Sequence, residues 1–155
     1  MQPIARTQVP NNVDFHYEIK FDGYRALLYI TETNVQLISR NNTDLTELFP
    51  EIIESCKLVR LKAKSLLPFT LDGEIVILNN PFQGNFSLLQ SRGRLRNKKS
   101  IHTAANRRPA TFMAFDLLQH KGKNCRSLQF TKRKSLLQKI FETSDFNHTL
   151  LPRIQ

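Results

Sequence analysis

The sequence predicts an α+β fold in which a mostly antiparallel sheet packs against helices, within a single domain that spans residues 1–155. Two strand-like runs joined by turn residues follow each other early in the chain, as in a β-meander. Later strand-like runs alternate with segments of helical period, which favours helices packed on a sheet. Hydrophobic residues make up 40% of the 155 residues, so a chain of this length can bury a core without disulfides or a structural metal.

The first strands are predicted from short apolar runs bounded by turn residues. Tyr17–Lys20 is typical of a short strand, and the following Asp22-Gly23 step is typical of a tight turn. Arg25–Ile30 and Asn34–Ser39 are rich in β-branched and aromatic residues and have strand length. We therefore expect three consecutive strands before residue 40.

A helix is predicted to begin at Pro50, since proline is favoured in the first turn of a helix. A 3.6-residue period places four small or apolar side chains on one face: Ile52, Cys56, Val59 and Ala63. On this face Cys56 is expected to be a small core residue rather than a reactive thiol.

The second half of the chain carries two more predicted strands and two more helices. The strands are Leu71–Leu78 and Thr111–Leu118, and the apolar character of the second favours a central position in the sheet. A short helix over Phe86–Gln90 is expected to be capped by Asn85. A last helix over Lys132–Phe141 should turn an apolar stripe inward: Leu136, Leu137, Ile140 and Phe141.

Several classes of protein are disfavoured. No apolar run approaches the roughly 20 residues of a membrane span, and the first residues lack the apolar core of a secretory signal. Cys56 and Cys125 fit neither a disulfide framework nor a metal-knuckle spacing. The scattered histidines form no ligand set: His16, His102, His120 and His148. These features predict a cytoplasmic protein without a membrane partner.

Positive charge is concentrated in the second half of the chain. The net charge is +10, and residues 75–155 hold 15 basic and three acidic side chains. The segment from Ser91 to Arg108 has no acid at all, which favours a nucleic-acid partner over a merely solvated face. The candidate DNA-binding residues are Arg92, Arg94, Arg96, Lys98, Lys99, Arg107 and Arg108.

The segment Glu18–Arg25 concentrates candidate catalytic groups. On a strand, Glu18 and Lys20 would point to the same face, just before the Asp22-Gly23 turn and Arg25. An ordinary lysine is almost fully protonated at neutral pH, so a nucleophilic role needs a neighbouring cation or burial. Arg25 or a bound metal ion could supply that help. The alternative is a surface lysine beside a hairpin turn.

Four motifs in order resemble those of the covalent nucleotidyltransferases, the polynucleotide ligases and capping enzymes. The K-x-D-G-x-R sequence of Lys20–Arg25 resembles motif I, and Ser39–Asn42 resembles motif Ia. Asp72–Val76 resembles motif III, and Phe112–Leu118 resembles motif IIIa. The Phe86–Arg92 stretch is most similar to the ligase module of bacterial ligase D, an ATP-dependent DNA ligase of non-homologous end joining.

The resemblance implies a partial ATP-grasp-like nucleotidyltransferase (adenylation) fold, with ATP and Mg²⁺ or Mn²⁺ as cofactors. Lys20 would then carry AMP as a covalent intermediate in DNA nick or end sealing during repair and recombination. Glu18 matches the residue that contacts adenine, and Phe115 the aromatic that stacks on it. Arg25 and Arg40 match residues that hold the ribose and the nick-flanking backbone. The other matched positions are Glu74, a ribose and metal-site carboxylate, and the supporting Asp22, Gly23 and Asp72.

Taken without the resemblance, the same residues have plainer interpretations. Phe115 in an apolar strand would be core packing. Asp72 and Glu74 would be two carboxylates on one exposed face of a strand, and Arg40 an ordinary turn arginine.

The sequence after Ile140 contains neither an E-G-like motif IV nor a K-x-K motif V, and no OB-fold segment follows. We therefore expect the chain to be the N-terminal part of an adenylation domain that seals no nicks alone and self-adenylates weakly or not at all. Expected partners are DNA, the end-joining factor Ku and a polymerase domain of a longer parent, in association with the bacterial nucleoid. Two alternatives remain: an RNA ligase or capping-type guanylyltransferase, and an inactive nucleic-acid-binding fragment.

Overall fold

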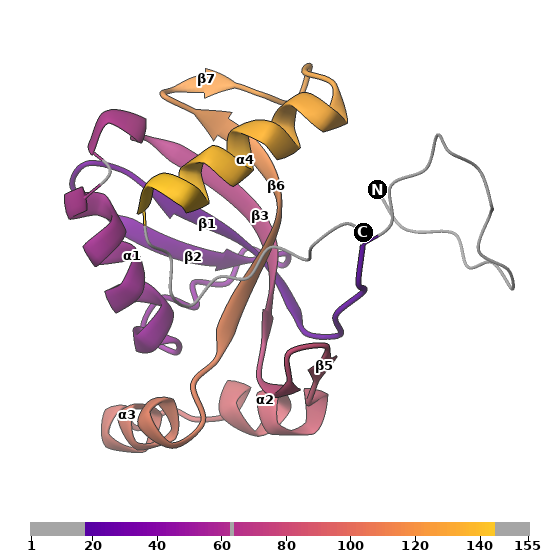
Figure 1. Cartoon of the computed structure of the whole chain (residues 1–155). Helices are drawn as coiled ribbons and strands as arrows, with labels where there is room; N and C mark the ends of the chain where they lie inside the picture. Colours follow the sequence, from indigo (N-terminus) through magenta and orange to yellow (C-terminus); the bar gives the residue numbers. More distant parts are fainter. Residues whose placement is uncertain (1–17, 63, 145–155) are drawn as a thin grey trace, which may run out of the picture.

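A computed structural model of the chain describes residues 18–62 and 64–144. Its main feature is a five-stranded antiparallel sheet in the order β2-β1-β3-β6-β7 (Figure 1). The strands of this sheet are β1 (Tyr24–Ile30), β2 (Val35–Ser39), β3 (Phe69–Val76), β6 (Thr111–His120) and β7 (Lys123–Asn124).

A separate hairpin joins β4 (Leu78–Asn80) to β5 (Gln83–Gly84). The helices are α1 (Pro50–Lys62), α2 (Phe86–Gly93), α3 (Lys98–Arg107) and α4 (Phe130–Ser144), with a short 3-10 turn at Lys64–Leu66. The predicted α+β class is confirmed.

Alternation along the strands separates an apolar face of the sheet from a polar one. Leu28, Leu71 and Leu117 point to the same side and are fully buried. The helices α1 and α4 complete this core with Cys56 and Leu137 among other apolar side chains, and α4 crosses in front of the strands in Figure 1. The opposite face is left to the polar side chains of β1 and β3, which include the candidate site residues.

Most predicted elements are confirmed within a few residues, but the first is not. Residues 18–20 have no strand conformation, and Tyr17 lies outside the described residues, as does Ala63 of the predicted helix face. The predicted strand Leu71–Leu78 ends at Val76, because Leu78 already belongs to β4. The sequence analysis expected a central position for Thr111–Leu118, but the middle strand of the sheet is β3. The outer edge of β6 is paired with β7 only at Gln119 and His120.

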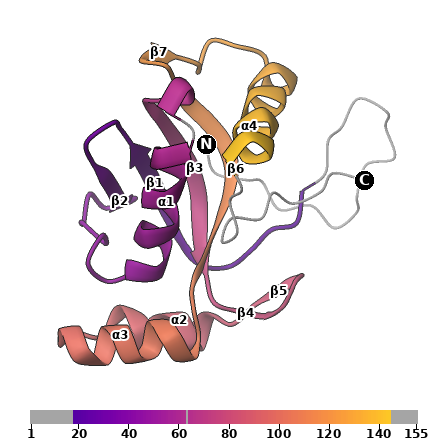
Figure 2. The same cartoon turned by 60° about the vertical axis from the view of Figure 1, so that its left-hand side comes forward.

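The basic segment contains a helix that the sequence analysis did not predict. α3 begins after Asn97, whose side chain accepts a hydrogen bond from the Ser100 amide at 3.2 Å, and it buries Ile101 and Ala105. α2 has the predicted cap: Asn85 accepts from the Leu88 amide at 3.0 Å. Figures 1 and 2 both show α2 and α3 together beyond one end of the sheet, so the basic residues sit on a compact helical pair.

Within the described residues, no helix combines the length and the apolar character that crossing a bilayer requires. The two cysteines are free and buried, which confirms Cys56 as a core residue. No cluster of three or more potential metal ligands occurs in the same part of the chain.

Candidate active site

The Asp22-Gly23 step is fixed to strand β3. The Gly23 amide donates a hydrogen bond to Oε1 of Glu74 at 3.0 Å. A β-carbon built on Gly23 would lie 2.1 Å from the carbonyl oxygen of Ile75, a contact that side chains do not tolerate. Only glycine therefore allows the chain before β1 to approach β3 this closely.

Lys20 lies on an irregular segment just before this step, and its side chain is exposed to solvent. The expected strand face shared by Glu18 and Lys20 is therefore wrong, because residues 18–20 pair with no strand. Burial raises the pKa of the Glu74 carboxyl, while the Gly23 hydrogen bond and the charges of Arg25 and Lys20 act to lower it. The charge of Lys20 is thus felt at Glu74, on the polar face of the sheet.

Arg25 and Asp72 form a two-pronged ion pair between β1 and β3. Nε of Arg25 donates to Oδ1 of Asp72 at 3.1 Å and Nη2 donates to Oδ2 at 2.7 Å. Asp72 is only 7% exposed, and this hydrogen bond is the main cause that raises the pKa of Arg25. This ion pair fixes the Arg25 side chain between β1 and β3, because a planar guanidinium and a carboxylate form two parallel hydrogen bonds. The buried Asp72 rules out the plain interpretation of two exposed carboxylates.

Phe115 is half-buried, so it is neither a fully buried core residue nor a free surface side chain. The register of β3 and β6 passes from Asp72 opposite Asp116 to Gly73 opposite Ala114, which makes Phe115 the extra residue of a β-bulge. Its ring lies 5.4 Å from the guanidinium carbon of Arg25. Phe115 therefore adjoins the Arg25–Asp72 pair.

Arg40 is brought to the same end of the sheet by backbone pairing. Its amide donates to the carbonyl oxygen of Arg25 at 3.0 Å, and its side chain is exposed. The turn that follows β2 is closed by a hydrogen bond from the Asn42 amide to Ser39, with Asn42 at a φ of 60°. The backbones of Arg25 and Arg40 therefore lie next to each other.

Helix α4 contributes two basic residues that the sequence analysis missed. Arg133 holds Asp116 by two hydrogen bonds of 2.7 and 3.0 Å. Lys134 forms an ion pair with Glu18 and lies 5.3 Å from the Phe130 ring centre. Because Glu18 and Lys134 are 116 positions apart, no local sequence signal indicates this contact.

The basic segment divides into a buried arginine and exposed cations. Arg92 is 3% exposed: Nε donates to the Leu48 carbonyl at 3.0 Å, and Nη2 binds both oxygens of Glu51. The prediction of Arg92 as a surface contact for DNA is therefore wrong, since its charge is paired with Glu51 of α1. The other predicted DNA contacts are exposed: Arg94, Arg96, Lys98, Lys99, Arg107 and Arg108.

Residues 4–153 match the family model described as "ATP dependent DNA ligase domain". The chain belongs to this family. This match over nearly all of the chain confirms the family that the ordered motifs predicted.

Two curated relatives show how the chain compares with longer ligases. It is 41% identical to the bifunctional non-homologous end joining protein LigD of Bacillus subtilis, over 93% of this chain and 24% of the relative. It is 32% identical to a DNA ligase of Thermoplasma volcanium, over 89% of this chain and 23% of the relative. The chain thus spans about a quarter of the length of these relatives.

Solved ligase structures have the same fold. The ligase domain of LigD from M. tuberculosis superposes with a TM-score of 0.70 at 26% identity, over 90% of this chain and 39% of that one. A mycobacterial DNA ligase D complexed with ATP and MES gives a TM-score of 0.69 at 26% identity, covering 90% and 40% of the two chains. The polar face described above therefore belongs to an ATP-dependent ligase domain.

Proposed function

We propose that the chain is the N-terminal part of a DNA ligase adenylation domain, in which Lys20 forms a covalent lysyl-AMP for nick or end sealing. The observation that carries this proposal is the family match over residues 4–153, which includes the lysine segment. The charge of Lys20, which acts to lower the pKa of Glu74, is compatible with it.

The step proposed for Lys20 is a phosphoryl transfer. The neutral amine attacks the α-phosphorus of ATP, an N–P bond forms, the bond to the bridging oxygen of pyrophosphate breaks, and the amine loses a proton. Such reactions depend mainly on positioning and on charge neutralisation. The exposed amine of Lys20 leaves room for a triphosphate to approach it.

The neighbouring residues would hold the nucleotide around this amine. Phe115 offers a ring face at the polar side of the sheet, and Arg25 lies against that ring. Arg40, beside Arg25, would bind the ribose or the nick-flanking strand. We assign the adenine contact to Glu18, which would exchange its partner Lys134 for the base.

A divalent ion, Mg²⁺ or Mn²⁺, would neutralise the phosphates. Magnesium typically binds through one or two carboxylates together with substrate phosphates, so a dedicated protein cage is not needed. Glu74 fits this requirement: Gly23 engages Oε1, and within the described residues the structure shows no second donor to this carboxylate. The part of the chain that the structure describes contains no competing cluster of three ligands.

The partners proposed for the parent protein are DNA, Ku and a polymerase domain, at the bacterial nucleoid in the cytoplasm. The names of two relatives support an end-joining context, since those of Bacillus subtilis and Pseudomonas aeruginosa are both called LigD. DNA is the partner that the family's description itself indicates.

The decisive test is covalent labelling. The chain is incubated with α-labelled ATP and Mg²⁺, and the adduct is mapped by peptide mass spectrometry. We expect a low yield of AMP on Lys20, reversal of the adduct by pyrophosphate, and no adduct in Lys20→Ala. Lys139→Ala, at an exposed position of α4, serves as a matched control for loss of a lysine. If AMP attaches elsewhere, or if ATP neither labels Lys20 nor protects it from amine-modifying reagents, the proposal fails.

The same assay separates the ligase from a capping-type guanylyltransferase. With GTP as donor we expect no adduct under conditions where ATP gives one. A preference for GTP would overturn the assignment of ATP as the substrate.

A further inference from the structure

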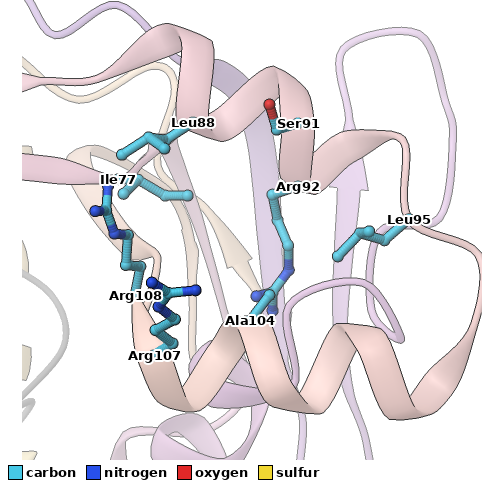
Figure 3. Close-up of a pocket in the computed structure, with 8 residues that line it drawn as sticks. All are labelled: Ile77, Leu88, Ser91, Arg92, Leu95, Ala104, Arg107 and Arg108. Carbon is cyan, nitrogen blue, oxygen red and sulfur yellow. The ribbon is translucent and has the colours of Figure 1, made fainter.

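A pocket of about 410 Å³ lies between α2 and α3, which lie together beyond one end of the sheet in Figure 1. Its volume falls in the range of small-molecule sites. Figure 3 shows the residues that line it, which come from both helices and from the segments next to them: Ile77, Leu88, Ser91, Arg92, Leu95, Ala104, Arg107 and Arg108. Most of the wall is apolar, and three guanidinium groups are its only charges.

The charges of this pocket are positive and largely uncompensated. Arg107 and Arg108 are exposed, and within the described residues neither forms a salt bridge. Arg92 uses its Nε–Nη2 edge on Leu48 and Glu51, whereas Nη1, on the other edge, is buried without a hydrogen-bond partner. Because Glu51 neutralises the charge of Arg92, the net positive charge of the pocket comes from Arg107 and Arg108.

The occupant must therefore be an anion that also offers an apolar surface. The wider charge pattern favours a polyanion over an isolated acid, because the sequence has no Asp or Glu between Glu74 and Asp116. A DNA strand meets both requirements, since each phosphate is flanked by the C–H groups of a deoxyribose.

We propose that the α2–α3 pocket binds one phosphate of a DNA strand together with its adjoining sugar. Arg107 and Arg108 bind the phosphate oxygens, and Leu88 and Ala104 contact the sugar. Arg92 contacts no DNA, since its bonds to Leu48 and Glu51 use it to hold α2 in place beneath the pocket. The inference rests on the proposed function, for which it names a strand-binding subsite outside the nucleotide site. Contacts of this kind position a strand without reading its sequence.

The test measures the affinity of the 155-residue chain for a nicked duplex, by fluorescence anisotropy at several salt concentrations. Arg107→Gln/Arg108→Gln should weaken binding about tenfold and reduce the salt slope by about 1 for each phosphate that is no longer neutralised. The matched control is Lys132→Gln/Lys139→Gln, which removes the same charge from exposed positions of α4 and should change the affinity less than twofold.

A second variant separates the pocket from general attraction between charges. Ala104→Leu fills the pocket without changing charge, and leucine is a good helix former. It should weaken DNA binding, while circular dichroism and the urea midpoint show that the fold is retained. Unchanged affinity in Ala104→Leu, or equal losses in the α4 control, overturns the inference.

Two further outcomes are informative. If an equally charged acidic peptide displaces the duplex as well as unlabelled DNA does, the assignment to DNA is wrong. Labelling of Lys20 by ATP and its protection from amine-modifying reagents are measured separately on the unaltered chain, so the absence of both beside pocket-dependent DNA binding would overturn the proposed function and leave the pocket in place.

Discussion

The amide of Gly23 and the carboxylate of Glu74 are joined by a hydrogen bond of 3.0 Å between residues 51 positions apart. This bond ties the irregular segment that carries Lys20 to the middle strand of the sheet. It links motif I to motif III directly, because motif I leads into β1 and motif III lies on β3, and these two strands pair in antiparallel register. The position of the segment that carries Lys20 therefore depends on residue 23 being glycine, because a side chain there would collide with β3.

The first prediction concerns this glycine. Gly23→Ala places a β-carbon against the Ile75 carbonyl and should lower the free energy of unfolding by about 1–3 kcal/mol, as overpacking does. Urea denaturation measures the change. In the control Gly84→Ala, the new carbon lies 3.4 Å from its nearest neighbour, so the loss should be smaller. Equal losses in both variants would show that the close approach of Gly23 to β3 is not the cause.

The second prediction follows from the raised pKa of Glu74. Burial is the main cause, so ionisation of Glu74 opposes folding. In the unfolded chain Glu74 has the ordinary glutamate pKa of about 4.3, whereas in the folded chain its pKa is higher. As pH rises through this interval, the unfolded chain loses its proton first, which favours unfolding, so the free energy of unfolding of the wild type falls. Glu74→Gln does not titrate and keeps an acceptor for Gly23.

The measurement compares wild type with Glu74→Gln by chemical denaturation at pH 4 and pH 7. The stability of the variant relative to wild type should be greater at pH 7 than at pH 4. Glu32→Gln, a change at an exposed position, provides the reference for general charge effects. A relative stability of Glu74→Gln that falls between pH 4 and pH 7 would contradict the prediction.

The third prediction tests the buried ion pair between α2 and α1. Arg92→Met leaves the Glu51 carboxylate buried without its partner, and removing one member of such a pair costs about 3–5 kcal/mol. Lys98→Met breaks the pair of Lys98 with Glu47, whose side chains are 78% and 80% exposed, and should cost less than about 1 kcal/mol. Thermal or urea unfolding of the two variants distinguishes them, and similar losses would mean that Arg92 is not a structural residue.

The fourth prediction is that the native chain lacks reactive thiols. Burial raises the pKa of both Cys56 and Cys125, so little thiolate forms at pH 8. A colorimetric thiol reagent should detect no rapid reaction in buffer and two thiols in urea. Cys125 should react before Cys56 as urea is added, because it lies beside the exposed β6–β7 turn. Rapid labelling of Cys56 in buffer would contradict its place in the core.

The sequence alone predicted those features that depend on local chemistry. The strand at Arg25–Ile30, the helix start at Pro50 and the Asn85 cap each depend on neighbours within a few positions, and all three are confirmed. The α3 helix was missed because its basic residues hide a weak apolar period, although Asn97 and the spacing of Ile101 and Ala105 were visible signals.

Only the tertiary structure decided which polar residues are buried together. Arg92 and Arg94 are close in sequence, yet one is 3% exposed and bonded to Glu51 while the other is exposed. Two other contacts likewise join residues far apart in the chain. The bulge in β6 places Phe115 beside Arg25, and Lys134 pairs with Glu18. Local propensity acts over a few residues, whereas desolvation and ion pairing depend on which distant segments the folded core brings into contact. For that reason the ordered motifs of this chain identified its family, and only the folded sheet and helices determined how each charged side chain is used.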